Sequence, residues 1–135
     1  MKNVFITLLA LVSIALISSC TKSPAENIVG EWKITDIQTS YEVPEDQMEA
    51  YNEALNGMKE SSKMIYMADG TYEKTISEET TTGKWKISED GKKLMEQSED
   101  GTNETVNITE LTDNKLITVS ELDDTQNTMT FEKVK

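Results

Sequence analysis

The sequence predicts an all-β domain, an eight-stranded antiparallel up-and-down barrel with one amphipathic helix inserted between the first and second strands. From residue 28 onward, short runs rich in Thr, Ile, Val, Tyr and Trp alternate with turn-forming pairs, which is typical of antiparallel strands. The runs number eight, and eight strands can close into a barrel that has no free edge. A single segment with apolar residues three and four positions apart predicts the helix.

Turn-forming pairs set the expected strand boundaries. Four pairs of Asp with Gly or Asn accept the positive φ angles of tight hairpin loops: Asp69-Gly70, Asp90-Gly91, Asp100-Gly101 and Asp113-Asn114. We therefore expect strands at residues 30–39, 63–67, 71–77, 82–88, 92–98, 103–111, 115–122 and 127–134. Residues 80–82, a run of three Thr after two Glu, are interpreted as the polar tip of a hairpin.

Apolar and polar residues alternate along these strands, so each strand has one dry face and one wet face. The apolar pairs that share a face are Trp32 with Ile34, Tyr72 with Ile76, Trp85 with Ile87, Val106 with Ile108, and Met129 with Phe131. Their neighbours are mostly Lys, Glu, Thr and Asn. The dry faces are predicted to point into the barrel and form its core.

The predicted helix lies between residues 44 and 62. Its apolar residues fall on one helical face: Met48, Tyr51, Leu55 and Met58. Pro44 suits the first turn of a helix, and Lys59 lies near the end where the helix dipole favours a cation. We interpret this helix either as a lid that gates a cavity at the barrel mouth or as a plug that fills the open end.

The first 19 residues are interpreted as a signal peptide. A short positive start is followed by an apolar run of 14 residues, from 4 to 17, that only Thr7 and Ser13 interrupt. This run is too short to cross a bilayer as a helix, which takes about 20 residues. It ends in Ile17, Ser18, Ser19 and Cys20.

That ending resembles a bacterial lipobox. The resemblance implies that Cys20 becomes the new N-terminus, that its thiol receives diacylglycerol and that its amine is acylated, for example with palmitate. Residues 20–27 would then form a polar, lipidated tether, and residues 28–135 the folded domain. We expect a bacterial cell-envelope protein held on a membrane by its acyl chains, most simply the outer membrane, with the domain in the periplasm or on the cell surface. The alternative is an ordinary signal peptide that leaves a free Cys.

Three sequence stretches resemble the lipocalin-like domain of small bacterial lipoproteins. Gly30-Glu31-Trp32 matches the G-x-W pattern that opens lipocalins, and the wider resemblance covers residues 29–34, 67–72 and 82–92. It implies a lipocalin-like barrel over residues 28–135. Lipocalins also place an Arg on the last strand against this Trp. The present chain has no Arg, so Lys133 or Lys135 is expected to take its place.

Composition excludes several classes of function. The chain has no Arg and no His, and without the signal peptide 12 Lys face 25 Asp and Glu, a net charge of −13. Such an acidic chain would repel nucleic acid. Without His the usual general base is absent, and with a single Cys no cysteine metal cluster can form. We therefore expect no enzyme activity, no cofactor and no metal.

A small hydrophobic ligand inside the barrel is the leading functional hypothesis. The candidate cavity residues are Trp32, Met67, Tyr72, Ile76, Trp85, Ile87 and Phe131, although the two Trp side chains also fit a purely structural core. The rival hypothesis is a surface interaction module, with a filled barrel whose loops bind a protein or a glycan. An apolar cavity above about 300 Å³ would favour the ligand.

Overall fold

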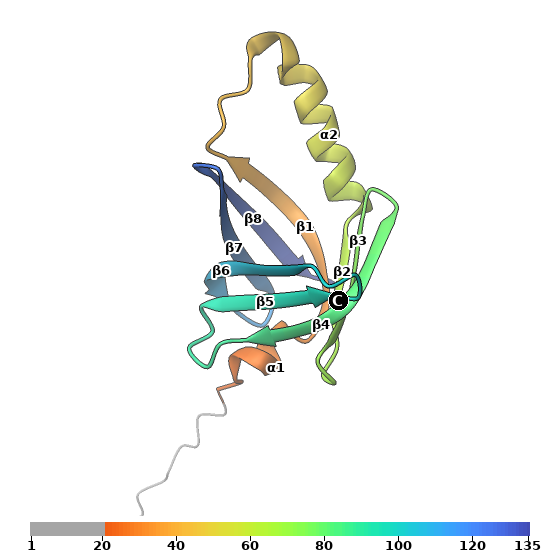
Figure 1. Ribbon diagram of the computed structural model, residues 1–135, viewed down its shortest axis with the longest axis vertical. Helices are drawn as coiled ribbons and strands as arrows, with labels where there is room; N and C mark the ends of the chain where they lie inside the picture. Colours follow the sequence, from red (N-terminus) through yellow and green to blue (C-terminus); the bar gives the residue numbers. More distant parts are fainter. Residues whose placement is uncertain (1–20) are drawn as a thin grey trace, which may run out of the picture.

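The computed structural model describes residues 21–135, so the signal peptide and Cys20 lie outside the described residues. It confirms the predicted closed antiparallel barrel, in which the strands follow one another in chain order and β8 pairs with β1 (Figure 1). The strands are β1 (Gly30–Thr39), β2 (Lys63–Tyr66), β3 (Thr71–Ile76), β4 (Glu79–Ile87), β5 (Lys93–Ser98), β6 (Asn103–Leu111), β7 (Lys115–Leu122) and β8 (Thr125–Lys133). The helical segments are α1 (Pro24–Ile28), η1 (Glu45–Gln47) and α2 (Met48–Ser61).

Three Asp-Gly turns behave as the sequence predicts. In each, an Oδ1 atom of the Asp accepts a hydrogen bond from the backbone N–H two residues later, at 3.0 Å for Asp69, 3.0 Å for Asp90 and 2.8 Å for Asp100. A hydroxyl from a neighbouring Thr or Ser donates to the same carboxylates, and together these hydrogen bonds lower the pKa of all three. The three acids therefore stabilise their turns in the ionised form.

Two further hairpins have turns that contain neither Gly nor Asn. Ser77 and Glu78 have φ angles of 51° and 71°, and Asp123 and Asp124 have φ angles of 48° and 64°. Positive φ at both central residues defines the type I′ turn that matches the twist of a hairpin. The prediction of a hairpin tip at residues 80–82 is therefore wrong: β4 begins at Glu79, and these residues belong to the β3–β4 ladder.

One end of the barrel, called the closed end below, is covered by α1. This corrects the prediction of a tether over residues 20–27, because residues 24–27 are helical. The Ser23 hydroxyl accepts from the Glu26 N–H at 3.3 Å, and the Glu26 carboxylate accepts from the Ser23 N–H at 2.7 Å, which forms a capping box. Ile28 is fully buried, and Trp32 Nε1 donates to its carbonyl oxygen at 2.7 Å.

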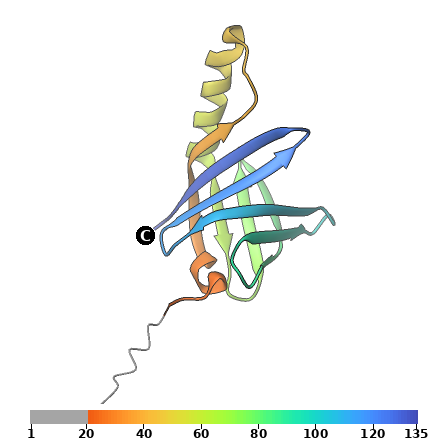
Figure 2. The same ribbon diagram turned by 90° about the vertical axis from the view of Figure 1, so that its left-hand side faces the viewer.

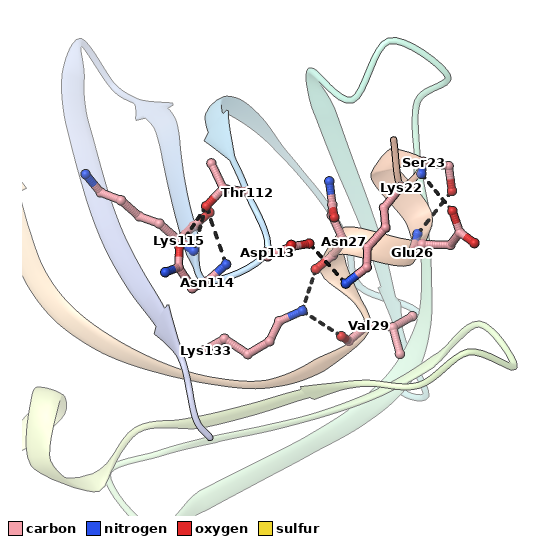
Figure 3. Close-up of polar contacts among 10 residues, drawn as sticks. All are labelled: Lys22, Ser23, Glu26, Asn27, Val29, Thr112, Asp113, Asn114, Lys115 and Lys133. Carbon is pink, nitrogen blue, oxygen red and sulfur yellow. Dashed lines mark hydrogen bonds and ion pairs between the residues drawn. The ribbon is translucent and has the colours of Figure 1, made fainter. Parts of the chain in front are cut away.

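Lys133 takes the place of the missing Arg at this closed end. Its Nζ lies 4.8 Å from the ring centroid of Trp32 and donates to the carbonyl oxygens of Asn27 at 2.7 Å and Val29 at 2.9 Å (Figure 3). Burial, and then repulsion from Lys22, lower the pKa of Lys133. The Lys133 side chain thus connects β8 to both α1 and β1.

The opposite end, called the open end, carries α2. The helix is confirmed, but it projects beyond the barrel (Figures 1 and 2), and none of its residues is buried. Tyr51, Leu55 and Met58 are partly covered, whereas Met48 is 40% exposed. The interpretation as a plug is therefore wrong, because these four side chains do not fill the barrel. Within residues 21–135, no helix combines the length and apolarity needed to cross a membrane.

The end of α2 nearest the barrel is anchored through two serines. The Ser62 hydroxyl accepts from the Ile34 N–H at 3.0 Å, and the Ser61 hydroxyl accepts from the Ser77 N–H at 3.1 Å. Ser62 is itself buried. The helix is thus joined to β1 and to the β3–β4 turn at its C-terminal end, while its N-terminal half extends away.

Candidate ligand-binding cavity

A cavity of about 220 Å³ lies inside the barrel, toward the open end. Ile76 at the end of β3 and Ser120 near the end of β7 mark its upper level. Most of its wall is apolar: Met64, Ile76, Leu94, Val106, Leu116, Met129 and Phe131. The remaining lining residues are polar or charged: Tyr66, Lys74, Glu96, Glu104, Thr118 and Ser120. The barrel is therefore not completely filled by side chains. Its cavity is, however, smaller than the volume of about 300 Å³ above which a ligand would be favoured.

Glu96 is the centre of a buried polar cluster in this wall. Its side chain is 6% exposed, and both carboxylate oxygens have partners. The Tyr66 hydroxyl donates to Oε1 at 2.5 Å, and the Lys74 ammonium forms an ion pair with Oε2. Lys74 Nζ also lies 3.7 Å from Oε2 of Glu104. The partners on both oxygens offset part of the free-energy penalty that this carboxylate incurs on leaving water.

Strand alternation brings these groups to the inner face. Lys74 lies between the inward-facing Tyr72 and Ile76 on β3, and Glu96 is two residues from the buried Leu94 on β5. In the barrel register, Glu96 stands directly opposite Glu104 of β6. The cluster thus combines β2, β3, β5 and β6.

Burial and neighbouring charges shift the pKa values of two of these groups, Tyr66 and Lys74. Burial, reinforced by the carboxylate of Glu96, raises the pKa of Tyr66 well above its ordinary value. For Lys74, burial acts to lower the pKa, but attraction to Glu96 and Glu104 outweighs it and raises the pKa. At neutral pH the phenol is therefore neutral and the ammonium is charged.

A second hollow of about 210 Å³ adjoins the first, because both are lined by Lys74, Glu96 and Glu104. It is the more polar of the two and also includes Tyr72, Thr81, Ser98, Asp100 and Thr102. Its charged residues are thus three carboxylates and one ammonium. A hydrogen bond from the Ser98 hydroxyl lowers the pKa of Asp100, which keeps this carboxylate ionised.

Three of the seven predicted cavity residues face these hollows. Ile76 and Phe131 lie in the wall of the 220 Å³ cavity, and Tyr72 lies in the adjoining hollow. Trp85 is half-buried and contacts Tyr66 edge to face at 6.0 Å. It lines a third depression along β4, β5 and β6, which shares Glu96 and Glu104 with the two hollows. Trp85 therefore supports the wall from beside the cavity.

The other three predicted residues lie elsewhere. Trp32 is fully buried at the closed end, where it contacts Ile28 and Lys133. Ile87 packs against the core without lining either hollow. Met67 is 37% exposed in the turn after β2, where its carbonyl accepts from Trp85 Nε1 at 2.9 Å. None of the three lines either hollow, because alternation identifies the inner face of a strand but not the level along the barrel.

The polar half of the wall was missed by sequence reasoning. Tyr66, Lys74, Glu96 and Glu104 were not predicted as site residues, although the alternation of Tyr72 with Ile76 already places Lys74 on the same face. The available signal was a charged residue at an inward position on each of three strands. Within residues 21–135, no group of three or more Asp, Glu, His or Cys side chains is arranged to hold a metal ion.

A closed up-and-down barrel of eight strands has an interior that side chains can fill or that can hold one small ligand, and in this chain part of that interior is a cavity. Comparison with known families agrees: the lipocalin-like domain matches residues 28–118, and the chain belongs to this family. No curated protein matches the chain.

Two solved structures from Bacteroides are similar to the chain. A DUF4847 family protein from Bacteroides vulgatus ATCC 8482 has a TM-score of 0.57 at 14% identity, over 80% of this chain and 94% of that one. A lipocalin-like protein from Bacteroides uniformis ATCC 8492 has a TM-score of 0.49 at 13% identity, over 80% of this chain and 99% of that one. At these identities, the similarity to the first protein concerns the fold alone.

Proposed function

We propose that this chain is a non-enzymatic lipoprotein of the bacterial cell envelope that carries a small apolar molecule inside its barrel. The observation that supports carriage is the cavity of about 220 Å³, in which seven apolar side chains surround a buried polar cluster. Ligand sites of proteins are typically concave and mostly apolar, with a few placed polar groups. This combination fits carriage better than it fits a filled structural core.

The volume limits the size of the molecule. An apolar cavity of about 150 Å³ admits benzene, whereas drug-sized ligands occupy about 300 Å³ or more. A cavity of about 220 Å³ with an adjoining hollow of about 210 Å³ therefore suits a single ring with a short chain, or a short branched alkyl group. A long fatty acid or a retinoid would extend beyond both.

The proposed anchor is Cys20, through its acyl chains. Only residues 21–23 separate Cys20 from α1, and three residues span at most about 10 Å. Lipidation at Cys20 would therefore hold the closed end near the membrane and direct the open end away from it. A net charge of −13 offers no attraction to anionic headgroups, so the acyl chains would supply the attachment.

The rival function, a surface interaction module, is favoured by one observation. α2 projects from the barrel, and Glu45 of η1 together with Glu49, Glu53 and Glu60 of α2 forms an acidic face beside Met48. An exposed acidic helix of this kind suits a basic protein partner.

Mass spectrometry of the protein purified from its own envelope tests both parts of the proposal. Under denaturing conditions, the mass should exceed that of residues 20–135 by a diacylglycerol and an acyl chain. Under native conditions, a further small mass should remain bound and should disappear on denaturation. The Cys20→Ser variant is the control, because it should lose the lipid and leave the membrane fraction.

A different result would contradict each of the two parts of the proposal, the lipid anchor and the carriage of a small molecule. An unmodified Cys20, or a Cys20→Ser variant that stays with membranes after a high-salt wash, would contradict the anchor. Identical native and denatured masses, with a second protein co-purifying, would contradict carriage and favour the interaction module.

A further inference from the structure

We propose that the molecule held in the barrel is a small organic amine, with its apolar part in the cavity and its ammonium group beside Glu104. This inference rests on the proposed carrier function and specifies the chemistry of its ligand. It follows from the distribution of charge around the two hollows and from the different exposure of their acidic residues.

Charge around the hollows favours a cation. Three carboxylates, those of Glu96, Asp100 and Glu104, share the polar hollow with a single ammonium, that of Lys74. No Arg or His occurs anywhere in the chain to offset them. An incoming ammonium gains attraction from the surplus carboxylates, whereas an incoming carboxylate meets their repulsion in a partly desolvated site.

Lys74 already interacts with two carboxylates of the protein, those of Glu96 and Glu104. Its Nζ forms the ion pair with Glu96 and lies 3.7 Å from Glu104, and Glu96 depends on it because the carboxylate is buried. A fatty-acid headgroup that recruited Lys74 would leave Glu96 without its cation, which is costly inside a protein. Lys74 is therefore a poor candidate for binding an anionic ligand.

Glu104 has the properties of a ligand contact. It lines both hollows, its side chain is 58% exposed, and its 3.7 Å separation from Lys74 is longer than a hydrogen bond. Its carboxylate can therefore turn toward an ammonium group at the rim. Glu96, by contrast, has both oxygens occupied and serves to hold the wall.

The apolar side of the cavity suits a flexible or aromatic body. Met64 and Met129 line it together with Phe131, and methionine side chains adapt to ligands of different shape and contact aromatic rings well. We therefore chose probes that share one phenyl ring and a four-carbon skeleton and that carry a cationic, a neutral or an anionic headgroup.

The test is isothermal titration of the full chain, in detergent micelles, with 4-phenylbutylamine, 4-phenylbutanol and 4-phenylbutyrate. Titration into protein-free micelles supplies the blank for partitioning. The amine should bind at least about tenfold more tightly than the alcohol, and the acid should bind most weakly. The preference for the amine should shrink as salt is added, because the site is partly open to solvent.

Glu104→Gln and Glu110→Gln form a matched pair of variants. Both residues lie on β6 and both changes remove one negative charge, but Glu110 lies near the closed end and pairs with Lys115. Glu104→Gln should bring the affinities of amine and alcohol within about threefold of each other without weakening the alcohol. Glu110→Gln should retain the tenfold preference, and circular dichroism should show both variants folded.

The outcomes separate this inference from the carrier function. Equal binding of the three probes, or tightest binding of the acid, would overturn the amine ligand while the barrel remained a carrier. An equal loss of preference in both variants would overturn the role of Glu104. If none of the three probes binds, both the amine ligand and the carrier function are contradicted.

Discussion

The carboxylate of Glu96 is held inside the barrel by Tyr66 on one oxygen and Lys74 on the other. Removing one partner of a buried charge is more costly than the net value of the interaction, because the remaining group stays desolvated without compensation. The wall of the cavity therefore depends on all three side chains being present.

This dependence predicts the behaviour of Tyr66→Phe. The variant should lose about 1–3 kcal/mol of unfolding free energy at pH 7, because Oε1 of Glu96 loses its donor. Above about pH 10 the wild type should lose stability, since the phenol of Tyr66 ionises in the unfolded chain but stays protonated in the fold. The raised pKa of Lys74 acts in the same direction, because its stabilising effect disappears as pH rises through the folded value.

Urea unfolding of the purified full chain between pH 7 and 11.5 measures both effects. The decline in stability above pH 10 should be shallower in Tyr66→Phe than in wild type. Tyr41→Phe, at an exposed position, is the control and should follow the wild type. Identical alkaline slopes in all three proteins would contradict the assigned environment of Tyr66.

The same residues show which features of the cavity wall the sequence does not predict. Alternation correctly places apolar pairs such as Tyr72 and Ile76 on the inner face, and the same spacing includes Lys74. A charged residue is normally read as solvent-exposed, because an isolated buried charge is strongly disfavoured. Only the fold reveals that Glu96, 22 residues later, supplies the partner that makes this burial possible.

At the scale of helices and strands, the hairpin turns explain which strand boundaries the sequence predicts correctly and which it does not. The boundaries of β1, β6 and β7 agree with the predicted ranges, and Asp100-Gly101 and Asp113-Asn114 mark the turns on either side of β6. The β3–β4 turn was missed because Ser77 and Glu78 adopt positive φ without Gly or Asn. Pairing and twist of the flanking strands impose that turn, which composition alone does not signal.

The helix α1 was missed for a related reason. Residues 21–27 carry almost no apolar surface, so composition favours an extended tether. The Ser23–Glu26 capping box and the burial of Ile28 at its end stabilise this short helix instead. Its role is structural, since it covers the closed end of the barrel beside Trp32.

The Lys133→Met variant tests how much Lys133, at the closed end, contributes to the free energy of unfolding. The change retains the aliphatic stem but removes two hydrogen bonds from a charged donor and the contact with the Trp32 ring. We expect a loss of about 2–4 kcal/mol in unfolding free energy, measured by urea denaturation. Lys135→Met removes the same charge at the exposed C-terminus and should change stability by no more than about 0.5 kcal/mol. Equal losses in the two variants would contradict the role of Lys133.

For the whole molecule, the two ends of the barrel have different roles. α1 and Lys133 close the end next to the proposed lipidation site, and the cavity and α2 lie toward the other end. An acidic surface would keep the domain away from anionic lipid while the acyl chains hold it nearby. In the arrangement that we propose, a ligand would enter and leave on the side away from the anchoring membrane.

The central claim is that the interior of this barrel binds a small molecule, and the methionines offer the most direct test. Met64 and Met129 line the cavity, whereas Met48 and Met67 are exposed outside it. The full chain, labelled with ¹³C at its methionine methyl groups, is titrated with 4-phenylbutanol and followed by NMR. We predict saturable shifts of the Met64 and Met129 signals while those of Met48 and Met67 stay in place. Shifts confined to Met48 or Met67, or no shift at any of the four, would contradict the claim.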